Sequence, residues 1–298
     1  MFFYNHLILC SILLAAPLCA IASQHLHHSC INKDCSALRL TVSNPPVNLW
    51  DANVISEFGN FLETLEEQNK TKVVVLASDV PAFYIAQIDL NIITPGALPG
   101  VNATEVLEQY YSNLNKLSAI PVIFIGEVNG RAWGAGDEHL MRMDMRFAGP
   151  QAVLGAPEAA VGLIHVGGKL GMQQLVDLIG PGRASEYMLS AAQVGAEEAA
   201  RVGWVNSAYP TAHALRAHVD KLATRIALFH IEVIRATKAS IAARGPKLKD
   251  FQDDLVRFDA LAAMPFLSKN VGEILALSNN QSLQWELNNN DNVVKGLY

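Results

Sequence analysis

The segment GRAWGAGDEHL, residues 130–140, places glycines and carboxylates close together. Three glycines lie within seven residues, and Asp137 and Glu138 follow the last of them directly. Glycines let backbone N–H groups approach a ligand closely, and a carboxylate beside them can donate or accept a proton. The segment therefore predicts either a turn that opens a helix at an active site or a flexible loop with a charged edge.

A second carboxylate, Glu158, lies twenty residues after Glu138 and directly follows Pro157 in the stretch LGAPEAAVGL. Another turn, AFYIAQIDL at 82–90, follows a stretch predicted to be a buried strand. Loops that follow the ends of parallel strands gather on one side of a sheet, where sites usually lie. We therefore expect two loops to direct backbone N–H groups toward one oxygen, with Glu138 and Glu158 as paired carboxylates beside it.

The segments around these turns alternate between strand and helix patterns. The order strand, helix, strand, helix, strand predicts a largely parallel α/β sheet covered by helices. Short strands and a mainly helical second half follow the glycine turn, with one long helical segment from His213 to Ala243. The five alternating segments are 37–43, 52–68, 72–78, 103–120 and 121–130.

The overall composition favours one large folded domain or two small ones. The chain has 298 residues, of which 51% are hydrophobic and 17% are charged, enough apolar material for a substantial core. Its formal net charge is -6 and it contains no basic run, so nucleic acid is not expected as a partner.

The N-terminal segment has the pattern of a secretory signal peptide over residues 1–23. LILCSILLAAPLCAIA is an apolar stretch too short for a typical membrane span, and Ala20 and Ala22 form an A-x-A-like cleavage site. This predicts a protein of the secretory pathway or the extracellular space, with no stable membrane span after cleavage. The preceding MFFYNH has no Lys or Arg, so an uncleaved membrane anchor is the alternative.

The cysteines agree with an oxidising compartment. Beyond the signal segment the chain has two, Cys30 and Cys35, in an N-terminal arm at 24–36. A disulfide between them is one interpretation, and a pair of free thiols in an unstructured arm is the other. Three histidines in the same arm could join them around zinc, but the spacing matches no standard zinc site and no metal is expected.

Several motifs occur in an order that resembles the crotonase (enoyl-CoA hydratase/isomerase) superfamily. They are PVIFIGEVNGRAWGAGDEHLMRMDMRFAG, LGAPEAAVGLIHVGGKLGMQQLVDLIG and GAEEAARVGWVNSAYP. The resemblance covers about residues 37–268. It implies an α/β ClpP/crotonase-like fold: a spiral of β-β-α units at 37–212, a C-terminal helical trimerisation region at 213–278 and a flexible tail at 279–298.

The resemblance also implies roles for particular residues. It places the two backbone N–H groups of an oxyanion hole at Ile88 and Ala135, and the two acid–base carboxylates at Glu138 and Glu158. A CoA thioester would be the substrate, no cofactor is expected, and the protein would hydrate or isomerise an acyl group as a homotrimer or hexamer. The substrate-binding positions fall on Ala86, Gln87, Gly134, Gly136 and His165.

The chain departs from the family pattern at several of these positions. Gln87 stands in place of a glycine, so its side chain could narrow the site or turn the Ile88 N–H away. His165 and Val166 replace Pro-Gly, and His165 is either a satisfied polar residue or a base near the pocket. The CoA-contacting tail is not recognisable after Leu267.

These departures leave two alternatives to an enoyl-CoA enzyme. CoA thioesters are scarce outside the main metabolic compartments, so the chain could be a secreted C–C hydrolase or decarboxylase for a non-CoA β-dicarbonyl or secondary metabolite. It could also be a non-catalytic scaffold that assembles through its C-terminal helices.

Other charged residues are expected to be structural. Asp89 and Asp144 are predicted turn or cap groups. Asp137 would tend to raise the pKa of Glu138 if both were buried. Lys169, Lys238 and Arg183 are expected to be solvated unless one of them meets a phosphate.

Overall fold

The computed structural model describes residues 24–94, 96–165, 171–243, 256, 258–261, 263–277 and 281–288. The expected signal peptide at 1–23, Val166, Lys169 and the end of the tail lie outside these ranges. Within the described ranges, no helix combines the length and apolar content that crossing a membrane requires.

The larger of the two sheets has six strands, of which all but the first run parallel. Its central strand has the sequence VVVLAS, and its first five residues are buried, as is typical of a parallel strand covered on both faces. In spatial order the strands are β1 (Leu26–Cys30), β2 (Ala37–Val42), β3 (Val73–Ser78), β5 (Ile123–Val128), β7 (Met145–Ala148) and β10 (Ser207–Ala208).

A second, four-stranded sheet lies beside the first and supplies the second strand of each β-β-α unit that the resemblance implies. Its strands are two or three residues long, too short for a periodic pattern to reveal. The first three run parallel and the last antiparallel. In spatial order they are β4 (Phe83–Ile85), β6 (Arg131–Trp133), β8 (Val153–Gly155) and β9 (Val194–Gly195).

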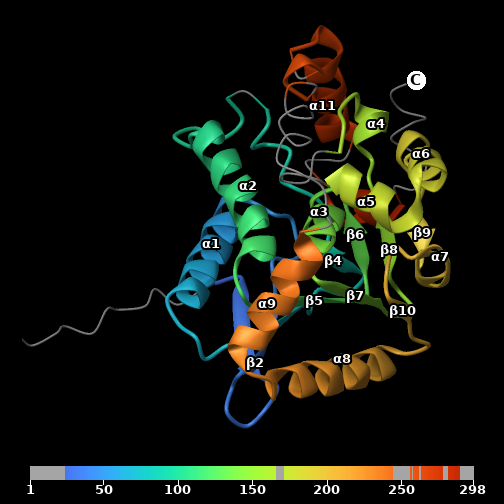
Figure 1. Cartoon of the computed structure of the whole chain (residues 1–298). Coiled ribbons are helices and arrows are strands. Elements are labelled where there is room, and N and C mark those ends of the chain that lie inside the picture. Colours follow the sequence, from blue (N-terminus) through green and yellow to red (C-terminus); the bar gives the residue numbers. More distant parts are fainter. Residues whose placement is uncertain are drawn as a thin grey trace, which may run out of the picture.

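The two sheets are linked by three successive β-β-α units, which confirm the expected fold class. Each unit sends one strand to the larger sheet and one to the smaller sheet before a helix follows (Figure 1). The units are β3-β4-α2, β5-β6-α3 and β7-β8-α4, with α2 at Ala103–Ala119, α3 at Ala135–Arg142 and α4 at Glu158–Val161. Three further helices follow: α5 (Gly171–Ile179), α6 (Pro181–Leu189) and α7 (Ala196–Val202).

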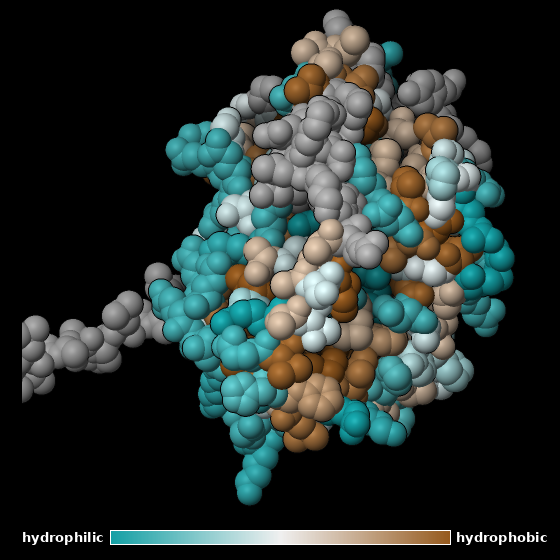
Figure 2. All heavy atoms as spheres, viewed as in Figure 1, coloured by the Kyte–Doolittle hydropathy of each residue, from teal (hydrophilic) through white to brown (hydrophobic). Residues whose placement is uncertain are grey.

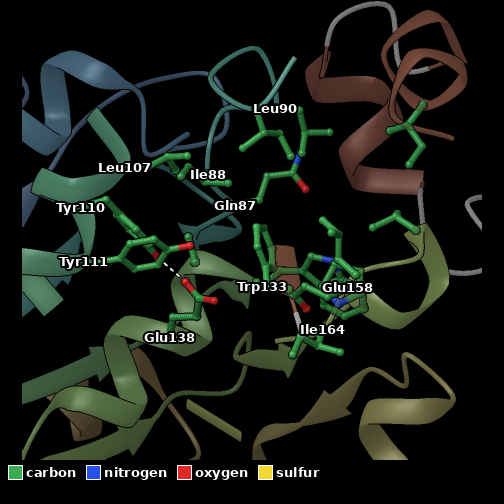
Figure 3. A pocket seen from close by; sticks show the side chains of 18 of the residues that line it. Gln87, Ile88, Leu90, Leu107, Tyr110, Tyr111, Trp133, Glu138, Glu158 and Ile164 are labelled. Atoms are coloured by element: carbon green, nitrogen blue, oxygen red, sulfur yellow. Dashed lines mark hydrogen bonds between the residues drawn. The ribbon is translucent and has the colours of Figure 1, made fainter. Parts of the chain in front are cut away.

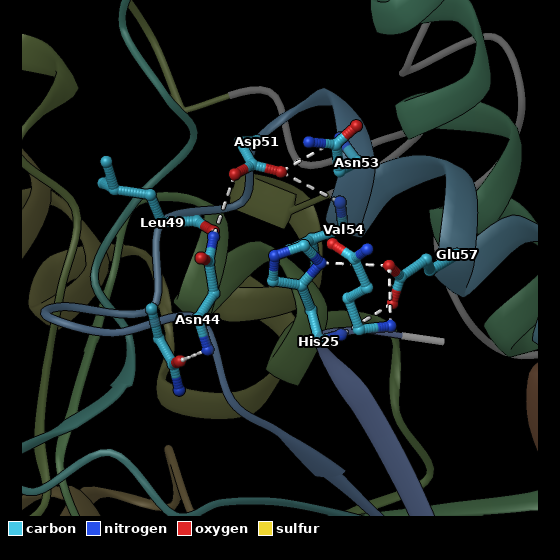
Figure 4. Close-up of polar contacts among 9 residues, drawn as sticks. His25, Asn44, Leu49, Asp51, Asn53, Val54 and Glu57 are labelled. Carbon is cyan, nitrogen blue, oxygen red and sulfur yellow. Dashed lines mark hydrogen bonds and ion pairs between the residues drawn. The ribbon is translucent and has the colours of Figure 1, made fainter. Parts of the chain in front are cut away.

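The segment expected as an N-terminal arm is an edge strand of the larger sheet. β1 pairs with β2 along its whole length, and a disulfide joins Cys30 to Cys35, so the disulfide interpretation is confirmed. His25 contacts Glu57 of α1 (Ala52–Glu66) at 3.0 Å. Asp51 caps that helix by accepting two backbone N–H bonds in its first turn (Figure 4).

The helical segment expected from His213 to Ala243 is two helices, α8 (Ala212–Ala227) and α9 (Ile231–Ala242). The expected segment is thus helical, with a break between Ala227 and Ile231. The Lys72 ammonium donates to the carbonyls of Ala227 (2.9 Å) and Phe229 (2.8 Å). A cation that satisfies the last carbonyls stabilises a helix end, and here it marks where α8 stops.

Lys238 of α9 is buried, contrary to the expectation that it is solvated. Its ammonium donates to the carbonyls of Leu117 and Val122 at 2.8 and 2.7 Å and to the Asp144 carboxylate at 3.0 Å. Burial lowers the pKa of Lys238, and Asp144 opposes that change. Asp144 also accepts the Phe124 N–H, so its expected structural role agrees with its contacts.

The C-terminal region adds α11 (Pro265–Leu277), at the top of the view in Figure 1, and α12 (Leu283–Asn288). A flexible tail was expected from residue 279, but within it residues 283–288 form a helix and Gln281 is buried. Gln281 is held there by hydrogen bonds to Gln87 and Asp89, which lie far away in the chain. Contacts of this kind leave no periodic pattern in the local sequence.

Candidate active site

The loops expected to form a site line one pocket, which has a volume of about 100 Å³ and mostly apolar walls. Loops after β4, β6 and β8, together with α2 and the C-terminal helices, surround it (Figure 3). The polar side chains that reach it include Gln87, Glu138 and Glu158. Its apolar wall includes Leu90, Leu107, Tyr110, Trp133, Leu163 and Trp285.

The glycine turn brings the first turn of α3 against the smaller sheet. Gly134 has φ +51°, a left-handed conformation, and a side chain there would meet the Glu158 carboxylate at 3.2 Å. A side chain at Gly136 would lie 2.4 Å from the Ile85 carbonyl. The glycines thus allow close packing, and they leave the Ala135 N–H in the first turn, where helix N–H groups have no partner within the helix.

The Ile88 N–H points away from Trp50, with which Ile88 forms a short parallel pairing. Trp50 accepts the Asp89 N–H (3.2 Å) and donates to the Gln87 carbonyl (2.9 Å), so Ile88 forms a parallel bridge with Trp50. In such a bridge the N–H of the central residue points to the opposite side. Within the described ranges, neither the Ile88 N–H nor the Ala135 N–H has an acceptor, and both residues line the pocket.

The two glutamates reach the pocket from different helices. Glu138 lies in the first turn of α3 and accepts a hydrogen bond from the Tyr110 hydroxyl of α2 (Figure 3). Glu158 is the first residue of α4. The Oε2 atom of Glu158 is buried and has no hydrogen-bond partner in the described part of the chain. The spacing of twenty residues therefore does place both carboxylates at one pocket.

His165 lies behind the two glutamates, and its side chain is 1% exposed. Its Nδ1 atom is 3.1 Å from Glu158 Oε1 and 3.7 Å from Glu138 Oε1, while Nε2 is 3.2 Å from Asp137 Oδ2. Burial alone lowers the pKa of His165, but Glu158, Asp137 and Glu138 outweigh it and raise the pKa well above its usual value. The negative charges of these carboxylates thus favour the protonated form of the ring.

Asp137 and Glu138 have separate partners although they are adjacent and both buried. Asp137 Oδ1 accepts a hydrogen bond from the Trp204 indole at 2.8 Å, and its other oxygen faces His165. Glu138 faces Tyr110 instead. The two carboxylates thus each have a compensating donor, which the sequence argument about their mutual repulsion did not include.

The other buried histidine of α3, His139, has different surroundings. The rings of Trp50, Phe58 and Tyr110 surround it, and its Nδ1 lies 2.7 Å from the Ala135 carbonyl. Burial lowers its pKa to about 4, so this ring is neutral at pH 7. Its contacts fit a structural role.

Two of the expected substrate-binding residues lie behind the pocket wall. Ala86 is fully buried and its N–H donates to the Asn48 carbonyl. Gly136 packs against β4. Gly134 and Gln87 do line the pocket, whereas His165 contacts the carboxylates from outside it.

Gln87 reaches a residue of the C-terminal segment. Its amide Nε2 donates to Gln281 Oε1 at 2.9 Å, and the same Gln281 oxygen accepts the Leu90 N–H at 3.2 Å. Gln281 Nε2 donates to Asp89 Oδ1 at 2.8 Å, which agrees with a structural role for Asp89. Gln281, Trp285 and Tyr110 were missed by sequence reasoning, since none lies in a recognised motif and all reach the site through long-range contacts.

A metal ion could bridge oxygens of Glu138 and Glu158 and a ring nitrogen of His165, which lie within 4.8 Å of one another. The contacts that the structure shows within this group are ion pairs between His165 and the two carboxylates. The expectation that the protein works without a metal remains a prediction.

Residues 33–253 match the family model for enoyl-CoA hydratase/isomerase. The chain belongs to this family, which is the crotonase superfamily indicated by its motifs. Membership indicates an enzyme of the hydratase/isomerase type.

Solved structures with this fold span almost the whole chain. A putative enoyl-CoA hydratase from Streptomyces avermitilis is 28% identical, with 93% of this chain and 99% of that chain covered and a TM-score of 0.78. DspI from Pseudomonas aeruginosa is also 28% identical, with coverage of 80% and 96% and a TM-score of 0.67. An enoyl-CoA hydratase from Bacillus anthracis, 22% identical over 87% and 97%, with a TM-score of 0.66, shares the fold.

Proposed function

We propose that this protein hydrates, or isomerises the double bond of, a 2-enoyl thioester, with Glu138 and Glu158 as the acid–base pair. The observation that supports this most strongly is that both carboxylates reach the one pocket that the Ile88 and Ala135 N–H groups also line. The reaction needs this combination: an anion develops on the thioester oxygen while protons move at the adjacent carbons.

The two N–H groups form the proposed oxyanion hole. Ala135 lies at the N-terminus of α3, where the helix dipole adds to the attraction for negative charge. Losing one such donor typically raises a reaction barrier by about 3–4 kcal/mol. The Gln87 side chain donates to Gln281, and Ile88 keeps its bridge to Trp50, so the glycine-to-glutamine departure is compatible with this role.

The glutamates would hold one water and transfer protons between it and the α-carbon of the substrate. Glu138 is oriented by the Tyr110 hydroxyl, and Glu158 is oriented by His165. A water and an enoyl group trapped together react as a single unit, which removes much of the entropic barrier. The apolar walls suit a short acyl group.

Hydration of a short 2-enoyl-CoA by the purified protein tests this proposal. We expect Glu138→Gln and Glu158→Gln each to lower kcat on the order of 10²-fold or more, because each removes a proton-transfer group. Glu105→Gln, on the exposed side of α2, is the matched control and should keep the wild-type rate. Unchanged turnover in Glu138→Gln would refute the mechanism.

A second candidate is a C–C hydrolase or decarboxylase for a compact β-dicarbonyl without CoA. It is favoured by the small volume of the pocket, about 100 Å³, and by the contact between Gln87 and Gln281 at its edge. The same oxyanion hole would stabilise the enolate that such a reaction forms. Saturable CoA binding in titration calorimetry would argue against this candidate and for the first.

The remaining alternative is a scaffold without catalysis, which turnover of any thioester would exclude. We also propose that the protein acts in the secretory pathway or outside the cell, since disulfides such as Cys30–Cys35 persist in oxidising compartments. N-terminal sequencing of the secreted protein tests this: a start near Gln24 supports cleavage, and membrane retention with residues 1–23 intact supports an anchor.

A further inference from the structure

Proton balance sets a requirement on the proposed hydration. The water oxygen bonds to the β-carbon while its proton passes to the Glu138 carboxylate, and the π electrons move to the thioester oxygen. The proton of a Glu158 carboxylic acid then passes to the α-carbon as the enolate collapses. After one turnover Glu138 is protonated and Glu158 is ionised, so a proton must return from one to the other before the next cycle.

His165 lies where such a return would pass. Its Nδ1 atom is 3.1 Å from Glu158 Oε1 and 3.7 Å from Glu138 Oε1, so one ring nitrogen contacts both carboxylates. The first distance is a hydrogen bond and the second needs only a small approach. The side chain is 1% exposed, so it lies out of contact with bulk solvent.

The other ring nitrogen lies beside a third carboxylate. Nε2 is 3.2 Å from Asp137 Oδ2, an ion-pair contact without hydrogen-bond geometry, and the Trp204 indole donates to the other Asp137 oxygen at 2.8 Å. Both Asp137 and Trp204 are fully buried. A carboxylate beside one nitrogen of a histidine stabilises the ring cation and leaves the opposite nitrogen to exchange protons.

We propose that His165 returns the proton from Glu138 to Glu158 between turnovers. The inference rests on the proposed function. The imidazolium gives its Nδ1 proton to the ionised Glu158, and the neutral nitrogen then takes the proton that Glu138 received from water. Each step breaks one N–H or O–H bond and forms one, so the ring and both glutamates end as they began. His165 acts through the two carboxylates and does not touch the substrate.

The charged groups around His165 favour its cation. Asp137 and Glu138 face it from α3, and Glu158 faces it from α4. The Tyr110 hydroxyl of α2 donates to Glu138, and the Arg146 guanidinium of β7 attracts the Asp137 carboxylate electrostatically. At each stage of the cycle Asp137 and one of the two glutamates are ionised beside the ring, and these negative charges raise the pKa of His165.

Comparison of the first turnover with the steady state tests the proposal. In His165→Ala we expect the first turnover, measured with enzyme in excess, to stay within about threefold of wild type, because both glutamates remain. Steady-state turnover should fall on the order of 10²-fold, because the proton return is lost. Added imidazole, which fits the space left by the side chain, should restore the steady-state rate.

Two further measurements keep the test decisive if His165→Ala does not fold. His165→Gln keeps an amide of similar size and should show the same gap between first and later turnovers. In the wild-type protein labelled with ¹⁵N-histidine, NMR should show His165 protonated on both nitrogens at pH 7, and a neutral ring would overturn the proposal. His218→Asn, on α8, is the matched control and should behave as wild type.

The outcomes separate this inference from the proposed function. If the wild type hydrates no enoyl thioester, the proposed function is wrong. If it does, but the histidine variants lose the first and later turnovers equally, or His165→Ala does not respond to imidazole, the function stands and the proton return by His165 is refuted.

Discussion

His139 of α3 and the neighbouring His165 have pKa values shifted in opposite directions because their surroundings differ. Three aromatic rings surround His139, and among the described residues no anion offsets the cost of burying a positive charge there. His165 faces three carboxylates. Burial favours the neutral ring in both, and only nearby anions reverse that preference. The identity of a residue therefore does not decide its protonation here, whereas its neighbours do.

His139 should make the protein sensitive to acid. Its pKa is about 4 when folded, below the ordinary value of 6.5, so the unfolded chain binds the proton first as the pH falls. The stability this gives is present above pH 6.5 and is lost towards pH 4, an effect of about 3 kcal/mol. His139→Gln should reduce this pH dependence in urea unfolding. An equally steep loss in the variant would contradict the assignment, and His218→Asn should retain the wild-type dependence.

At the scale of elements, the C-terminal segment contributes to the pocket both by lining it and by holding one of its loops. Gln281 bonds to Gln87, Asp89 and the Leu90 N–H, and thereby fixes the loop that presents Ile88. Trp285 of α12 then lines the pocket. Gln87 and Gln281 are separated by almost two hundred residues, so their contact cannot be deduced from the local sequence around either one.

Gln281→Ala should loosen this loop. The Leu90 N–H loses its acceptor, and a hydrogen bond worth about 1–1.5 kcal/mol corresponds to roughly tenfold faster amide exchange at that site. Hydrogen–deuterium exchange of the peptide that contains Leu90 measures this. Gln151→Ala, at an exposed turn, should leave the exchange of that peptide unchanged. Wild-type protection in Gln281→Ala would show that other contacts hold the loop.

At the scale of the whole molecule, an apolar surface covers the turn between α8 and α9 and one side of α9. Figure 2 shows hydrophobic side chains gathered over this region. Leu228, Phe229, Val233 and Ile241 are between 46% and 73% exposed. Three of them line a groove of about 580 Å³. Monomeric soluble proteins rarely expose such a patch, so we expect it to be covered by another copy of the chain.

The expected assembly is a homotrimer or hexamer. Light scattering after size exclusion should give the mass of three or six protomers for the wild type. The double variant Val233→Asp with Ile241→Asp should dissociate it, because two charges would be buried without partners. Leu189→Asp, at a 78% exposed position on α6, is the control and should leave the mass unchanged. A wild-type monomer would refute the assembly.

Much of the fold could be predicted because its signals are local. The strand at 72–78 and the helix at 52–68 have clear periodicity, and the structure has β3 and α1 there. The glycine turn and the two glutamates were recognised from their spacing. The residues of the smaller sheet could not be predicted from local patterns, because strands such as β4 and β6 are too short to show alternation.

The sequence by itself determined the family, the order of the β-β-α units and the two carboxylates at the pocket. All three features depend on residue types at fixed spacings along the chain. Local backbone preferences and the order of the strands then place those residues in space. Only the tertiary structure decided that His165 is a cation between those carboxylates and that Gln281 holds the Gln87 loop. Both depend on contacts between distant segments, where burial and opposing charges act across space and leave no pattern in the sequence.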